Sequence, residues 1–150
     1  MSAIKEKIFN HCRQLVNEKI AVLEQSMKDY QEAANEDSKS SMGDKYETNR
    51  AMMHLEKEKA ATQLNQMQKM RQLLDTLKIE KKAEQAAIGS LVTTEKGKYF
   101  LSIGLGPINY EGEQYFVISA ASPIGQAMVG RKVGEVFEFR GGKDRIIKID

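Results

Sequence analysis

The sequence has one cysteine, two prolines and no tryptophan among its 150 residues. Because Cys12 stands alone, an internal disulfide is impossible, and the expectation is a cytoplasmic, reducing environment. Apart from Cys12, the soft metal ligands are His11 and His54, and neither CxxC nor HExxH occurs. A dedicated zinc site is therefore not expected, and the residues predict no cofactor of the protein's own.

Long apolar runs and an excess of one charge are also missing. No stretch approaches the roughly 18 apolar residues of a membrane span, so no membrane partner is expected. The first residues lack the apolar core of a secretory signal. The chain has 23 basic and 21 acidic side chains, a net charge of +2. A general nucleic-acid binder would show a strong basic excess, so any contact with nucleic acid is expected to be indirect.

Glycine and proline are nearly absent from the first half. Gly43 is the only glycine before Gly89, and the other ten glycines and both prolines follow Ile88. Such a shift in composition marks a domain boundary. The sequence therefore predicts an N-terminal region over residues 1–87 and a C-terminal domain over residues 88–150.

The first half carries two apolar stripes at helical spacing. The first consists of Cys12, Val16, Ile20, Leu23, Met27, Tyr30 and Ala34. The second consists of Met53, Ala60, Leu64, Met67, Leu74 and Leu77. Turn-forming residues separate them, which predicts an antiparallel coiled-coil hairpin with its tip near residues 37–44. The alternative is one continuous helix in a dimeric coiled coil. Gly43 would cost about 1 kcal/mol inside a helix, so the hairpin, and with it a monomer, is favoured.

The second half consists of short β-branched or aromatic runs separated by turn sequences. The runs cover residues 90–94, 98–105, 113–119, 135–140 and 145–150. Between the third and fourth, Ser122 can cap a helix, Pro123 suits its first position and Gly130 can end it. The prediction is a small antiparallel sheet with one short helix, which makes the whole chain an α+β protein.

The stretch "SMGDKYET" at residues 41–48 places Asp44 and Glu47 three residues apart where the second helix begins. Such a pair can simply start a helix, since an acidic first turn complements the helix dipole and nearly forms a capping box. It can also present two carboxylates on one face, as Mg²⁺ prefers. Glu36 and Asp37 add negative charge at the end of the first arm, and we expect them to be solvated turn residues.

The stretch "ISAASPIGQAMVGRKVGEVFEF" at residues 118–139 resembles the C-terminal signature of the Gre transcript-cleavage factors, GreA and GreB. The residues in register are Ile118, Ser119, Ser122, Pro123, Ile124, Ala127, Met128, Val129, Gly130, Gly134 and Glu135. The tip sequence "GDKYE" is similar to the family's acidic tip, with Gly43, Asp44 and Glu47 in place. The order of a helical hairpin and then a strand-rich domain also matches.

This resemblance implies a bacterial-type transcription elongation factor with an FKBP-like C-terminal domain. That domain would dock on RNA polymerase beside its secondary channel, through Ser119, Ser122, Pro123, Ile124 and Gly125. The hairpin would enter the channel, where Asp44 and Glu47 would help to hold a second Mg²⁺ of the polymerase active site for cleavage of backtracked RNA. The protein would be an accessory factor and not an enzyme, and it would contact nascent RNA only indirectly.

Two alternatives remain at this point. After Glu47 the family continues with Asn-Ala-Glu-Tyr, whereas this chain has Thr48, Asn49 and Arg50, and Lys45 lies between the two acids. A Gre-fold regulator that occupies or blocks the channel without cleavage is therefore the second hypothesis. The third is a prolyl isomerase, which the FKBP-like fold suggests and which too few aromatic residues support.

Overall fold

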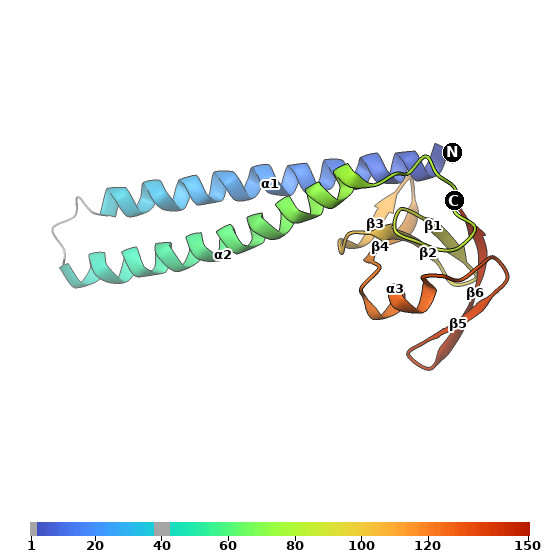
Figure 1. Ribbon diagram of the computed structural model, residues 1–150. Helices are drawn as coiled ribbons and strands as arrows, with labels where there is room; N and C mark the ends of the chain where they lie inside the picture. The colour runs from blue at the N-terminus through green and yellow to red at the C-terminus, as the bar shows by residue number, and fades with distance from the viewer. Residues whose placement is uncertain (1–2, 38–42) are drawn as a thin grey trace. The chain divides into compact units, whose positions relative to one another are not determined.

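The computed structural model describes residues 3–37 and 43–150, with side chains described for residues 3–35 and 47–150 (Figure 1). The chain forms two compact units. One is Leu15–Arg71, and the other combines Met1–Gln14 with Gln72–Asp150. The domain boundary expected from the sequence, between residues 87 and 88, stays a prediction.

The first unit is a helical hairpin, as predicted. Helix α1 spans Ala3–Asp37 and helix α2 spans Gly43–Thr76. Within Leu15–Arg71 the two helices run side by side in opposite directions (Figure 1). This arrangement contradicts the alternative of one continuous helix. Most of the predicted tip, residues 38–42, lies outside the described residues.

The predicted apolar stripes form the seam between the helices. Val16, Ile20 and Ala60 are buried, whereas Tyr30 and Met53 nearer the tip are only partly buried. Lys57 on α2 donates a hydrogen bond to the side-chain carbonyl of Gln31 on α1. Toward the tip, the apolar side chains between the helices are therefore less buried, and a polar contact joins the two helices.

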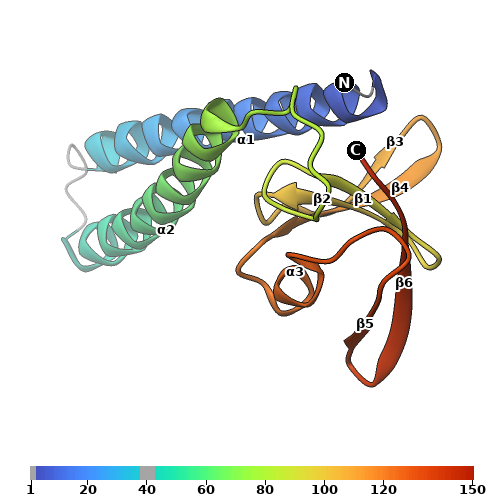
Figure 2. The ribbon, with the colours of Figure 1, turned by 45° about the vertical axis from the view of Figure 1, so that its right-hand side comes forward.

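The second unit contains a six-stranded sheet with strand order β3-β4-β2-β1-β6-β5. The strands are β1 (Leu91–Thr94), β2 (Lys98–Ser102), β3 (Gly106–Tyr110), β4 (Glu113–Ser119), β5 (Val136–Phe139) and β6 (Gly142–Ile149). The short helix α3, Pro123–Met128, packs against β4 and β5 (Figure 2). The predicted α+β fold and its single short helix are confirmed.

Two details of the sheet differ from the prediction. Strand β3 was not predicted, because Gly106 and Pro107 interrupt its pattern. Proline is tolerated there since β3 lies at the edge of the sheet. Strands β2 and β4 pair in parallel, with Phe100 opposite Val117, so the prediction of a wholly antiparallel sheet is wrong for this pair. Because β3 reverses the chain before β4, β4 returns in the direction of β2.

The core of this unit joins the sheet to α3. Its buried residues are Ala86, Val92, Leu101, Met128, Phe137, Ile146 and Ile149. Two hairpin turns have left-handed backbone at both central residues: Glu111 and Gly112 between β3 and β4, and Arg140 and Gly141 between β5 and β6. This geometry suits the twist of paired strands and confirms the turn predicted at residues 110–113. The other turn was predicted at residues 141–144, but strand β6 already begins at Gly142, so that turn lies earlier than predicted. No helix in the described parts of the chain is long and apolar enough to cross a membrane.

Candidate functional site

The acidic pair lies at the start of α2. The helix begins at Gly43, so the backbone places both Asp44 and Glu47 within α2 and not at its cap. Residues three apart lie on one face of a helix, so the spacing required for a shared ion is present in the backbone. The side chain of Glu47 is exposed, whereas that of Asp44 lies outside the described side chains, as do those of Glu36 and Asp37.

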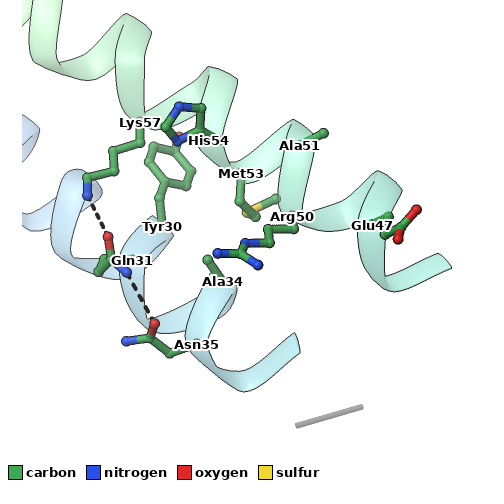
Figure 3. Close-up of a pocket in the computed structure, with 10 residues that line it drawn as sticks. All are labelled: Tyr30, Gln31, Ala34, Asn35, Glu47, Arg50, Ala51, Met53, His54 and Lys57. Carbon is green, nitrogen blue, oxygen red and sulfur yellow. Dashed lines mark hydrogen bonds between the residues drawn. The ribbon is translucent and has the colours of Figure 1, made fainter. Parts of the chain in front are cut away.

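Glu47 is one of ten residues around a hollow of about 800 Å³ between the arms of the hairpin (Figure 3). Helix α1 contributes Tyr30, Gln31, Ala34 and Asn35 to its lining, and α2 contributes the others. Ala34 on α1 is partly buried, whereas Ala51 on α2 is exposed. The hollow is therefore lined by small side chains together with the longer polar ones of both arms.

The side of the hollow formed by α2 is mainly basic. Arg50, His54 and Lys57 follow Glu47 at spacings of three, four and three, which places all four on one helix face. In Figure 3 the Arg50 guanidinium extends toward α1, whereas the Glu47 carboxylate points away from it. His54 lies 3.1 Å from Glu58, its partner one turn further along α2.

Amide side chains complete the hollow on the α1 side. Gln31 accepts the bond from Lys57 and donates one of 3.1 Å to the side-chain oxygen of Asn35. This group of side chains, which includes His54, was not predicted from the sequence. The spacing of Glu47, Arg50, His54 and Lys57 indicates that they share one face of α2. It does not show whether that face is turned toward α1.

This arrangement holds no metal cluster by itself. Among the described residues, no group of three or more His, Cys, Asp or Glu side chains could hold a metal ion. Glu47 offers one exposed carboxylate, and the neighbouring positive charges would oppose a cation placed beside them.

The second group of predicted residues lies in the other unit, at the junction of β4 and α3. Strand β4 ends at Ser119, and Ser122 caps α3 by accepting a hydrogen bond of 3.1 Å from the Gly125 amide. The Ser122 hydroxyl also donates to the Ser119 carbonyl at 2.6 Å. The Ser119 hydroxyl accepts from the Ala121 amide at 3.1 Å. Both predicted serines therefore fix the shape of this turn.

The remaining three residues of the segment differ in accessibility. Pro123 is exposed at the first position of α3, whereas Ile124 packs against the core and Gly125 is buried. A Cβ on Gly125 would lie 2.1 Å from the Ser119 carbonyl oxygen, so only glycine fits. Of these three, Pro123 is the one available to a partner, and Gly125 acts through the shape of the turn.

Comparison with known proteins finds a family similar to the C-terminal part of the chain. Residues 81–150 match the family described as "Transcription elongation factor, GreA/GreB, C-term". A search of curated proteins found no match. Among solved structures, that of the transcription factor Gfh1 aligns over 94% of this chain and 92% of its own, with 19% identity and a TM-score of 0.33. This score is too low to establish a shared overall fold, so the assignment rests on residues 81–150.

Proposed function

Since its residues 81–150 belong to the GreA/GreB family of transcription elongation factors, we propose that this protein binds RNA polymerase at the secondary channel. The family match carries this proposal, because it covers the β4–α3 junction with all five predicted docking residues. The hydrogen bonds of Ser119 and Ser122 give that junction a preformed shape, and Pro123 presents an exposed apolar ring. Preformed surfaces lose little conformational freedom on binding. Such a factor would work in the cytoplasm.

The hairpin is the proposed carrier of chemistry. Helix α1 has 35 residues, which at 1.5 Å per residue is about 50 Å. An arm of this length can present Asp44 and Glu47 inside a channel while another part of the chain binds outside. Phosphodiester cleavage by two metal ions needs both ions held close together. The two carboxylates would supply ligands for the second Mg²⁺ of the polymerase, which would itself hydrolyse the backtracked RNA.

The alternative is a regulator that occupies the same channel and does not stimulate cleavage. One observation favours it: Glu47 shares its helix face with Arg50, His54 and Lys57. Arg50 carries a positive charge one helical turn from Glu47, and such a charge raises the free energy of a Mg²⁺ bound nearby. Under this alternative, the acidic pair serves the start of α2.

One experiment distinguishes the two functions. RNA cleavage would be measured in backtracked complexes of bacterial RNA polymerase, with the unchanged protein and with Asp44→Ala/Glu47→Ala, and polymerase binding would be measured in parallel. Faster cleavage that the double variant loses while it still binds supports the metal-positioning role. Binding with unchanged or slower cleavage supports the regulator. Absence of binding by the unchanged protein contradicts both.

A further inference from the structure

A second surface of the C-terminal unit is lined by none of the predicted docking residues. It is a groove of about 500 Å³, lined by residues 82–84, by Lys132 and Val133 after α3, and by residues 147–149 at the end of β6. None of these residues belongs to the 119–125 segment or to the hollow of the hairpin. The groove therefore requires its own explanation.

Backbone hydrogen bonds fix the walls of this groove. The Ala86 amide donates to the Arg131 carbonyl at 2.8 Å, and the Gly130 amide donates to the Ala86 carbonyl at 2.8 Å. Gln85 and Lys132 form an isolated antiparallel bridge. The segment before the sheet is thus joined to the segment after α3. A groove with such walls is formed before any partner arrives.

The groove exposes apolar side chains. Val133 is 56% exposed and Ile147 is 53% exposed, although both are large apolar residues. Single exposed apolar residues are ordinary on protein surfaces. Here two line the same groove next to the buried Ile149, so an apolar side chain of a partner could cover both at once. Covering them would remove apolar surface from water.

The charges of the lining are predominantly positive. Lys82, Lys132 and Lys148 line the groove, against the single carboxylate of Glu84. Lys148 is 3.4 Å from Asp150 and so already has a partner. In the part of the chain that the structure describes, neither Lys82 nor Lys132 forms an ion pair. Two exposed ammonium groups are thus available beside the apolar pair.

We propose that this groove binds a short segment of a partner protein that carries apolar and acidic side chains. The apolar side chains would cover Val133 and Ile147, and the carboxylates would pair with Lys82 and Lys132. Nucleic acid fits less well, because the groove has neither the aromatic platforms nor the arginines on which unpaired bases stack. This proposal does not depend on binding to RNA polymerase, since its residues are separate from those of the docking segment.

The test uses the full chain, labelled with ¹⁵N, and a short peptide of leucine and glutamate as the probe. Binding should be saturable and should shift the amide signals of Val133 and Ile147. Lys82→Glu/Lys132→Glu should weaken binding roughly tenfold, because two exposed attractions become repulsions. The matched control Lys28→Glu/Lys69→Glu changes the net charge equally on the exposed surface of the hairpin helices and should leave the affinity within about twofold.

Further variants and probes test the role of charge, the role of apolar contact and the binding of other partners separately. The Lys82→Glu/Lys132→Glu variant should gain affinity for a peptide of leucine and lysine. Val133→Ser/Ile147→Ser should weaken the original peptide at least fivefold, whereas Val22→Ser, at a residue 65% exposed on α1, should not. The proposal is overturned if no saturable shifts occur at the groove, or if a peptide of serine and glutamate binds equally well. Preference for anionic lipid vesicles or for a second copy of the chain would also overturn it.

Discussion

At the scale of single residues, the sheet depends on a buried carboxylate that the sequence did not single out. Asp144 is 8% exposed and accepts a 2.7 Å hydrogen bond from the Thr94 hydroxyl. It also accepts from the backbone amides of Lys96, at 3.3 Å, and Arg145, at 2.8 Å. One side chain thus joins the turn between β1 and β2 to strand β6. A buried charge is tolerated because several donors surround it.

Removal of this carboxylate should destabilise the C-terminal unit. Asp144→Ala removes the acceptor of the Arg145 amide, whereas the Thr94 hydroxyl keeps the Gly97 carbonyl and the Lys96 amide keeps the Thr94 hydroxyl. We therefore expect a loss of about 1–3 kcal/mol in the free energy of unfolding. Asp144→Asn keeps one acceptor oxygen and should lose less than Asp144→Ala. Urea unfolding followed by circular dichroism measures both. Equal stability of the unchanged protein and Asp144→Ala would show that solvent replaces these bonds.

The lone cysteine provides a second prediction at this scale. Cys12 is fully buried on α1, and burial raises the pKa of its thiol to about 12. The thiol should therefore stay protonated and react with a disulfide reagent at pH 8 only when the chain opens. We expect labelling in native buffer to be at least about a hundredfold slower than in denaturant. Rapid native labelling would contradict the burial of Cys12.

The same shift predicts a loss of stability in alkali. The unfolded thiol ionises near its ordinary pKa of about 9, whereas the folded thiol ionises only near 12. The thiol's contribution to stability is complete below pH 9 and declines as pH rises toward 12, because hydroxide favours the unfolded thiolate. Comparison with Cys12→Ala at each pH isolates this contribution, since the alanine variant lacks the titrating group.

At the scale of elements, the junction of β4 and α3 depends on the absence of a side chain at Gly125. Gly125→Ala would place a Cβ against the Ser119 carbonyl, so β4 and α3 would have to separate. We expect a loss of about 2 kcal/mol or more. Gly104→Ala is the matched control, because nothing lies within 4 Å of the added atom. Thermal unfolding measures both, and an equal effect of the two changes would contradict the close approach.

Helices, caps and turns were predictable from the sequence where they depend on residues close together in the chain. The stripes of α1 and α2, the Ser122 cap and the turn at Gly112 were each confirmed, because each depends on spacing or on one residue's conformational preference. The turn predicted at residues 141–144 lies earlier, since β6 begins at Gly142. Strand β3 was missed because Gly106 and Pro107 conceal it. The parallel pairing of β2 with β4 was missed because pairing joins residues far apart in the sequence.

The candidate site was predictable only in part. The acidic pair was found from its spacing, and the docking segment from a resemblance covering residues 118–139. The side chains of Arg50, His54 and Lys57 around the hollow were not found, because the hollow is lined by residues of both arms. Periodicity places side chains on a helix face, but it does not show which gaps the opposite helix leaves.

At the scale of the whole molecule, the chain forms two compact units, a helical hairpin and a unit whose residues 81–150 match the GreA/GreB C-terminal family. The family assignment rests on one unit and the proposed chemistry on the other. Binding to RNA polymerase is therefore the central claim, since cleavage and channel occupation both require it. Pro123 is the exposed member of the junction, and Pro107, exposed in strand β3, provides a matched position.

The most direct test is fluorescence anisotropy of the labelled protein titrated with bacterial core RNA polymerase. We expect saturable binding that Pro123→Glu weakens at least about tenfold and that Pro107→Glu leaves unchanged, because only the first change alters the docking surface. Equal effects of the two substitutions would contradict docking through the β4–α3 junction. No saturable binding by the unchanged protein would contradict the proposed function itself.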